Sequence, residues 1–468
     1  MRNHSSRAAR IAFVIASAMV IASAFLGVAH VPATAASSGV SSWTVYRGDA
    51  SGTGVSTVLK SVTTSKRAWT SPVLSGEIYG EPLVFSNDVF VATENDNVYA
   101  LSATRGSVVW RRHLASAVAS SDLPCGNISP AVGITGTPAI DPSRSEIFVV
   151  ADELVNGHAE HFLVGMSTTT GAVELRQRVD PPGSDPAALL QRTGLNLDGG
   201  RVVFGMGGNY GDCATYRGRV VSVREVGSTP AFFTVDNQAG NSQGAVWMGG
   251  AAPVVDARGN VWVSVGNGSV HSAGQAFDDS DSVLELTSTV RLEQYFAPST
   301  WASDNVSDAD MSTAPALLAD GQVVLAGKSP TVYLLNGAHL GGIGSQEASL
   351  SSVCSNNIEG GSAVVGATVF LPCLNGPVAI RAAKSPPSLK VLWQASAGGG
   401  PPIVAADLVW TVGKNGVLYG LDESTGAVRQ QANVGSVDND FTTPSVGDGL
   451  LLIASSNRVM AFRGMPRS

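Results

Sequence analysis

Charged residues are scarce in this sequence of 468 residues: they make up 14% of it, against roughly 25% in an ordinary soluble domain. So low a content excludes a disordered chain or a coiled coil, both of which depend on charge. The 29 Lys and Arg residues are outnumbered by 37 Asp and Glu residues, which leaves a net charge of −8. This balance argues against a nucleic-acid or anionic-membrane partner held by bulk charge.

Motifs that carry redox or metal chemistry are also scarce. None of the four cysteines forms a Cys-x-x-Cys pair, which excludes a thioredoxin-like site, a zinc ribbon and a covalent c-type haem. The seven histidines include no His-Glu-x-x-His motif, the zinc-binding helix of metalloproteases. The sequence therefore does not name an activity by itself.

The first 36 residues have the organisation of a secretory signal peptide. Three arginines precede residue 11, an uncharged run follows as far as His30, and Ala33-Thr34-Ala35 provides a cleavage site. An uncleaved membrane anchor is the alternative, because the run approaches spanning length. We predict cleavage after Ala35 and a secreted, extracytoplasmic protein with no later membrane span.

From residue 70 onward, short apolar strands alternate with glycine and proline turns, supplied by 53 glycines and 23 prolines. Residues 80–110 and 400–429 are the clearest copies of this pattern. Eight copies begin 40 to 62 residues apart, which matches a four-stranded propeller blade of roughly 40–50 residues with some loop insertions. The copies begin at Pro82, Pro138, Leu195, Pro253, Pro315, Ser362, Pro402 and Pro444.

The two ends of the repeat predict how the ring closes. The eighth copy ends at Phe462 with no room for an outer strand, whereas residues 66–70 match the outer-strand positions of other copies. We therefore predict an all-β chain, an eight-bladed β-propeller of four-stranded antiparallel blades whose last blade is closed by the N-terminal strand. The expected organisation is a signal peptide (1–35), an N-terminal extended segment (36–65) and the propeller (66–468), as a monomer.

The positions of the cysteines in this repeat favour one disulfide pairing among the three that four cysteines allow. Cys213 and Cys373 fall in turns between inner strands, while Cys125 and Cys354 lie in connections between copies. We predict the pairs Cys125–Cys213 and Cys354–Cys373, each of which would fasten a long loop to a rigid turn.

Residues 100–110 read Ala-x-Ser-x-x-x-Gly-x-x-x-Trp, which resembles the tryptophan-docking motif of quinoprotein dehydrogenases. Partial copies lie at 165–175 and 420–430, with Leu175 and Gln430 in place of the tryptophan. The repeat of this family is the PQQ-like β-propeller repeat, and the resemblance covers about residues 66–464. It implies that the tryptophan of one blade packs against the next blade and that the aspartate holds a turn. The residues that match the motif are Ala100, Gly106, Trp110, Asp422 and Gly426.

The resemblance also raises the question of a cofactor. Alcohol dehydrogenases of this family hold PQQ over an adjacent Cys-Cys disulfide, with a carboxylate-rich Ca²⁺ site and an aspartate base. This sequence has no Cys-Cys pair and no haem-binding Cys-x-x-Cys-His. We therefore carry over the fold and predict no cofactor, with PQQ and calcium kept as the alternative.

Three groups of acidic residues are candidate sites. Asp278, Asp279 and Asp281 cluster in a loop of the fourth copy, where their carboxylates would suit a hard cation such as Ca²⁺, although a solvated loop is the simpler interpretation. The acids at 308–310 and 438–440 precede the fifth and eighth copies. Loops between blades gather around the axis of a propeller, so these acids could meet, although single loop acids are usually turn residues.

Histidine and tryptophan give weaker signals. His158 and His161 would lie on opposite faces of a strand, so they could chelate a metal only from a turn, and a solvated turn is the simpler interpretation. The tryptophans fit blade packing, with a stacking role for a sugar or quinone as the alternative. The six tryptophans concerned are Trp69, Trp110, Trp247, Trp262, Trp393 and Trp410.

An intact repeat without redox or hydrolytic motifs favours a non-catalytic binding or scaffolding module, whose funnel face takes an extracellular protein or polymer ligand. The alternative is a divergent quinoprotein oxidoreductase that uses PQQ and Ca²⁺ to oxidise an alcohol, polyol or sugar.

Overall fold

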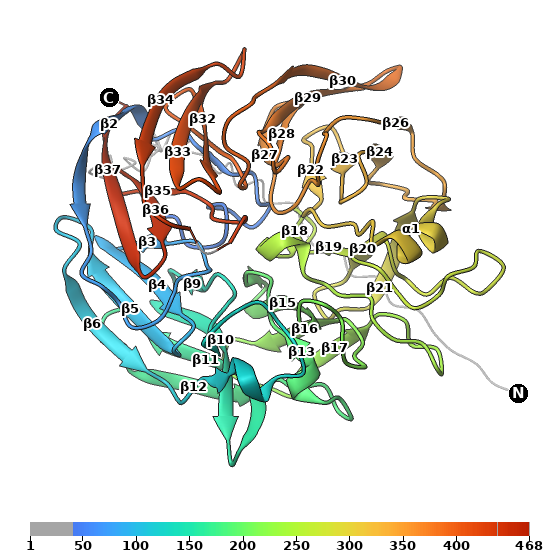
Figure 1. Cartoon of the computed structure of the whole chain (residues 1–468), viewed down its shortest axis with the longest axis horizontal. Helices are drawn as coiled ribbons and strands as arrows, with labels where there is room; N and C mark the ends of the chain where they lie inside the picture. Colours follow the sequence, from blue (N-terminus) through green and yellow to red (C-terminus); the bar gives the residue numbers. More distant parts are fainter. Residues whose placement is uncertain (1–40, 438, 468) are drawn as a thin grey trace, which may run out of the picture. The chain divides into compact units, whose positions relative to one another are not determined.

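A computed structural model describes residues 41–437 and 439–467 of the chain, so the signal peptide predicted at 1–35 lies outside the described residues. The described part forms eight four-stranded antiparallel blades that follow one another around a ring (Figure 1). Within each of the first seven blades the four strands follow in chain order. The predicted fold class, an eight-bladed β-propeller, is confirmed.

The first four blades occupy residues 83–297. Blade 1 contains β3 (Leu83–Phe85), β4 (Asp88–Thr93), β5 (Asn97–Ser102) and β6 (Val108–His113), and blade 2 contains β9 (Ala139–Asp141), β10 (Glu146–Val155), β11 (His158–Ser167) and β12 (Val173–Arg178). Blade 3 contains β14 (Asn196–Asp198), β15 (Arg201–Gly208), β16 (Arg219–Arg224) and β17 (Ala231–Thr234), and blade 4 contains β18 (Val254–Val255), β19 (Val261–Val265), β20 (Ser282–Leu286) and β21 (Leu292–Ala297).

The other four blades complete the ring. Blade 5 contains β22 (Ala316–Leu317), β23 (Gln322–Leu325), β24 (Val332–Asn336) and β26 (Ala348–Leu350), and blade 6 contains β27 (Ala363–Val365), β28 (Thr368–Leu371), β29 (Val378–Lys384) and β30 (Pro387–Gln394). Blade 7 contains β31 (Ile403–Ala405), β32 (Leu408–Gly413), β33 (Val417–Asp422) and β34 (Val428–Asn433), and blade 8 contains β35 (Ser445–Gly447), β36 (Leu450–Ser455), β37 (Arg458–Pro466) and β2 (Leu59–Thr70).

Several shorter elements lie outside this pattern. A single α-helix, α1 (Trp301–Ser307), occurs in the described residues, in the connection between blades 4 and 5. None of the helices in this part of the chain has the length and apolar character needed to cross a bilayer. The remaining elements are β1 (Val55–Ser56), β7 (Val118–Ala119), β8 (Ala131–Val132), β13 (Leu189–Leu190), β25 (Gly342–Ile343) and the 3₁₀ turns η1 (Ser120–Asp122), η2 (Pro186–Ala188) and η3 (Met248–Gly250).

The sequence of each strand reflects its distance from the axis. The second strand of blade 1, β4, is buried over most of its length, because both of its faces pack against neighbouring blades. Its sequence is therefore an almost continuous apolar run. The outer strand β6 is mostly exposed and includes two arginines and a histidine.

The ring closes as predicted. β2 pairs antiparallel with β37 and forms the outer strand of blade 8, with Trp69 opposite Ala461. The strand begins at Leu59, so the chain joins the ring earlier than the boundary expected at residue 66. β2 covers the outer edge of β37 and becomes the outer strand of blade 8, the place that the fourth strand takes in the other blades.

Residues 41–56, which we call the belt, run inside the ring rather than forming a separate extended segment (Figure 1). The backbone carbonyls of the belt accept hydrogen bonds from inner strands of five blades. The belt also carries Arg47, which is 1% exposed and donates to the carbonyl of Gly361 in blade 6. The donors to the belt are the amides of Val84, Ile140, Val255, Val364 and Val404, at 2.8–2.9 Å.

Candidate functional site

A cavity of about 850 Å³, which we call the funnel, opens on the side of the ring where the chain crosses from blade to blade. It is lined by the connections between blades and by the turns between second and third strands. Loops far apart in sequence therefore meet around one axis. The lining residues used below are Tyr79, Arg192, Asp212, Trp247, Asn267, Asp308, Asp310, Lys328, Glu359, Leu374, Lys414, Asp440 and Phe441.

The centre of one wall is an ion-paired cluster around Lys328, which follows β23. Its Nζ lies 2.7 Å from a carboxylate oxygen of Asp308 and 2.9 Å from one of Asp310. Asp310 also accepts hydrogen bonds from the indole of Trp247 at 3.1 Å and from the amide of Asn267 at 2.8 Å. Burial disfavours the ammonium, but the two carboxylates outweigh burial and raise the pKa of Lys328. The ammonium of Lys328 is therefore held between two carboxylates of the funnel wall.

Arg192, in the connection between blades 2 and 3, is the most unusual residue of the funnel. It is 8% exposed, and its Nη2 has no hydrogen-bond partner among the described residues. The guanidinium carbon lies 5.2 Å from the ring centre of Phe441 and 5.8 Å from that of Tyr79. Gly250 packs against it so closely that a Cβ there would lie 2.9 Å from the guanidinium carbon. Burial lowers the pKa of Arg192, since the charged form lacks solvation.

Two disulfides fasten loops of the funnel. The structure pairs Cys125 with Cys213 and Cys354 with Cys373, in agreement with the predicted pairing, at Cα–Cα distances of 6.2 and 6.0 Å. Asp212 and Leu374 line the funnel directly beside two of these cysteines. The two disulfides therefore restrain the loops that line the funnel.

Most of the loop acids lie in one cavity, which the sequence offered only as the alternative to isolated turn residues. Asp308, Asp310 and Asp440 all line the funnel, as do Asp212 and Glu359. Asp438, the other predicted acid, lies outside the described residues. At the outer rim, Asp440 pairs with the exposed Lys414 at 3.1 Å.

The loop that contains Asp278, Asp279 and Asp281 does not line the funnel, and it is not the solvated loop expected from the sequence. Asp278 and Asp281 are 1% and 0% exposed. Asp278 accepts hydrogen bonds from the amides of Val270 and Ser280, so it closes its own loop. No three Asp, Glu, His or Cys side chains are arranged to hold a metal ion within residues 41–437 and 439–467. Metal binding by the three aspartates stays a prediction.

The expected solvated turn at His158 and His161 is wrong. Both residues lie in β11, where His158 is exposed and His161 is fully buried. The Nδ1 atom of His161 lies 2.8 Å from Asp180, and its Nε2 lies 3.7 Å from Asp152. Burial opposes the charged form of His161, but the two aspartates outweigh it and raise its pKa. The pair of histidines is split between two faces of the strand, as the spacing requires.

The tryptophans divide into packing residues and one funnel residue. Trp110 donates from its indole to the carbonyl of Thr168 at 2.8 Å, and its ring covers Gly171 of blade 2. Trp69 and Trp393 make the same contact with the turns of blades 1 and 7. Trp247 differs from the prediction that it packs between blades, since it is half-buried and lines the funnel.

The turn residues of the docking motif explain these contacts. Gly106 and Gly426 are the glycines on which Trp69 and Trp393 lie. Asp422 accepts hydrogen bonds from the amides and hydroxyls of Ser424 and Thr425, so it holds the turn that receives the tryptophan.

One motif match was missed from the sequence. Residues 240–244 read Gly-x-Ser-x-Gly, the pattern of the nucleophile elbow in α/β-hydrolases. Ser242 follows β17 in a loop, and its amide binds the hydroxyl of Ser269. A nucleophile elbow requires a turn from a strand into a helix, and the next helical segment here is only the three-residue 3₁₀ turn η3.

The sequence profile described as outer membrane protein assembly factor BamB matches residues 28–290, more than half of the chain. The chain belongs to the PQQ-like β-propeller repeat family. The search of curated proteins found no match to this sequence.

Solved structures resemble the propeller over most of its length. Quinohemoprotein alcohol dehydrogenase from Pseudomonas putida has a TM-score of 0.68 at 13% identity, over 91% of this chain and 81% of that chain. The corresponding enzyme from Comamonas testosteroni has a TM-score of 0.65 at 14% identity, over 91% and 81%. BamB from Moraxella catarrhalis has a TM-score of 0.52 at 14% identity, over 86% and 97%. At these identities the likeness concerns the fold alone.

Proposed function

We propose that this propeller is a non-catalytic, extracytoplasmic binding module whose funnel receives an anionic group of a protein or polymer ligand. The observation that carries the proposal is Arg192, a buried guanidinium with an unpartnered Nη2 at the wall of the funnel. A buried charge without a partner costs several kcal/mol. A ligand carboxylate or phosphate would supply the missing partner, and the two disulfides support a location outside the cytoplasm.

The groups around Arg192 suit such a ligand. The rings of Tyr79 and Phe441 lie within cation–π distance of the guanidinium. No carboxylate among the described residues forms an ion pair with it. The buried carboxyl group of Glu94 lies near enough to attract the guanidinium but makes no hydrogen bond to it, so the Nη2 atom is free to bind an incoming anion.

A second candidate is a quinoprotein oxidoreductase, and the observation that favours it is the indole of Trp247 beside Asp310 and Lys328 in the same cavity. The calcium ion of such enzymes does not fit this donor set, because the ammonium of Lys328 already lies between the two carboxylates that would bind the metal. We therefore derive no reaction step at this site.

Titration calorimetry with three probes tests the proposal. The probes are oligogalacturonate, its uncharged methyl ester, and PQQ with and without Ca²⁺. We expect the charged oligomer to bind and the ester to bind at least about tenfold more weakly, because hydrogen bonds to charged groups contribute about 1.5–3 kcal/mol. Reduction of a redox dye in the presence of PQQ, Ca²⁺ and an alcohol would favour the second candidate instead.

Two variants make the test specific. Arg192→Met removes an unpaired buried cation, so it should raise the midpoint of thermal unfolding while it weakens oligogalacturonate binding by about 10- to 100-fold. Lys390→Met is the control, since Lys390 is exposed on the outer strand β30 and does not line the funnel. Equal binding by wild type and Arg192→Met would contradict the proposal.

A further inference from the structure

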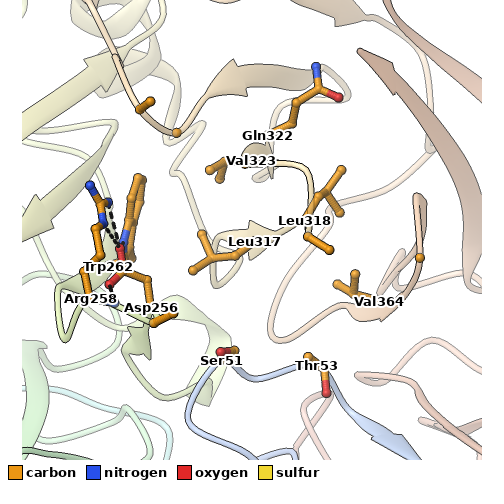
Figure 2. A pocket seen from close by; sticks show the side chains of 16 residues that line it. Ser51, Thr53, Asp256, Arg258, Trp262, Leu317, Leu318, Gln322, Val323 and Val364 are labelled. Carbon is orange, nitrogen blue, oxygen red and sulfur yellow. Dashed lines mark hydrogen bonds and ion pairs between the residues drawn. The ribbon is translucent and has the colours of Figure 1, made fainter.

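A second cavity, of about 540 Å³, lies beside the turns between first and second strands, at the end of the ring opposite the funnel. Figure 2 shows Leu317 near the middle of this cavity, with Ser51 and Thr53 of the belt across from the β22–β23 hairpin of blade 5. Its apolar lining comes from three blades. The apolar residues used here are Trp262, Leu317, Leu318, Val323 and Val364.

The belt explains why the cavity is there. The third residue of the repeat, counted from the copy starts, donates its amide to the belt in five blades. In blade 3 the side chain of Asn196 donates to the carbonyl of Ala50 instead, and in blade 8 the amide of Asp448 donates to Ser41. Blade 5 has no hydrogen bond to the belt among the described residues. Leu317 holds the equivalent position there.

The path of the belt accounts for this gap. Val255 of blade 4 donates to Ala50, and Val364 of blade 6 donates to Thr53, so the belt passes blade 5 between these two residues. A turn closed by the amide of Gly52 on the carbonyl of Asp49 carries the chain past β22. The cavity is the space that this turn leaves.

The edge of β22 beside the cavity is a free strand edge. Leu318 donates to Gln322 of the neighbouring β23, and Ala316 lies opposite Val324. Because successive residues of a strand point their amides in opposite directions, the amide of Leu317 points away from β23 and toward the belt side. No acceptor for it occurs among the described residues. A free amide and carbonyl beside apolar side chains form the edge to which an extended peptide adds.

We infer that the cavity of blade 5 is a docking site for an extended peptide segment of a partner protein, which pairs with β22 and inserts an apolar side chain beside Leu317. The occupant is a strand, because in blades 1 and 7 the same position of the repeat forms a β-pair with belt backbone: Val84 pairs with Trp43, and Val404 pairs with Val55. The apolar lining selects a branched aliphatic side chain at the paired position. This site is independent of the funnel.

Amide hydrogen exchange of the full chain gives the first test. We expect the amide of Leu317 to exchange at least about tenfold faster than those of the five paired residues, because it lacks their hydrogen bond. If the amide of Leu317 exchanges as slowly as the five paired amides in the isolated protein, the inference is overturned. This holds whether a second copy of the chain or a segment before Ser41 protects that amide.

Selection from a random heptapeptide library, with counter-selection against Leu317→Asp, gives the second test. Selected peptides should slow exchange at Leu317, and methylation of one backbone nitrogen should weaken binding by at least about tenfold, since β-pairing needs that donor. Val226→Asp is the control, because Val226 is 67% exposed in a turn of blade 3. The inference would be overturned if the selected peptides bind equally well after methylation. It would also be overturned if the selection yields no peptide whose binding depends on Leu317.

Discussion

Replacing Gly106 with alanine tests whether β2 truly closes the ring. Gly106 belongs to blade 1 and has a φ of +69°, and the indole of Trp69 in β2 lies directly over its Cα. A Cβ at this position would fall within the van der Waals radius of the Trp69 ring. The substitution therefore combines left-handed backbone strain, about 1–2 kcal/mol, with overpacking of about 1–3 kcal/mol.

The two contributions separate in a double-mutant cycle. Trp69→Ala alone should cost about 3–5 kcal/mol, because the indole is 8% exposed and also donates to the carbonyl of Ala103 at 2.7 Å. In that background, Gly106→Ala retains the backbone strain but loses the clash. The double variant should therefore cost about 1–3 kcal/mol less than the sum of the single variants.

Urea unfolding followed by far-ultraviolet circular dichroism measures these free energies without relying on tryptophan fluorescence. The matched control is the cycle of Gly426 and Trp393, where a Cβ would lie 2.5 Å from the indole between two internal blades. If the ring closes through β2, the two coupling energies should be similar. Additivity within about 0.5 kcal/mol at Gly106 and Trp69, with coupling at Gly426 and Trp393, would refute closure.

Three further predictions concern charge and disulfides. Burial raises the pKa of Glu81 to about 8, so the native state holds its proton more tightly than the unfolded state, and the free energy of unfolding should fall between about pH 5 and pH 8. In Glu81→Gln, the difference between the free energies of unfolding at pH 5 and pH 8, measured by urea titration, should be smaller by a few kcal/mol. An unchanged difference would exclude Glu81 as the source of the pH dependence. Lys328→Met should lower the midpoint of thermal unfolding because it leaves Asp308 and Asp310 without their ion pair. Millimolar Ca²⁺ should restore part of this loss in a calorimetric scan. No response to Ca²⁺ would contradict the idea that the ammonium of Lys328 occupies the position that a metal ion would take. Removal of the Cys125–Cys213 disulfide should destabilise the fold by about 1 kcal/mol more than removal of Cys354–Cys373, since the sequence separations are 88 and 19 residues. Denaturant midpoints of the two double-serine variants measure this difference, and an equal or reversed order would contradict loop entropy as its cause.

Local patterns were enough to predict the ring and its closure. Strand length and turn residues depend on nearby sequence, and the surplus outer strand at Trp69 matches the strand missing from the last copy. β2 pairs with β37 as this match indicates. The pairing of Cys125 with Cys213 followed from the same frame. These features repeat from blade to blade, so each copy supports the interpretation of the others.

Burial of polar groups was the main failure of sequence reasoning. His161 and Asp281 were expected in solvated segments, yet both are 0% exposed. A polar residue in a short loop looks the same in sequence whether a neighbouring blade covers it or not. Arg192 gave no signal at all, because its importance is the lack of a partner in space.

Sequence by itself determined the number of blades, the strand that closes them and the disulfide pairs, because each of these depends on a period or spacing along the chain. Tertiary structure alone decided the path of the belt, the unpaired guanidinium of Arg192 in the funnel and the free amide of Leu317. The physical reason is that a hydrogen bond made or missing between distant segments depends on which backbone groups the fold brings within about 3 Å of each other.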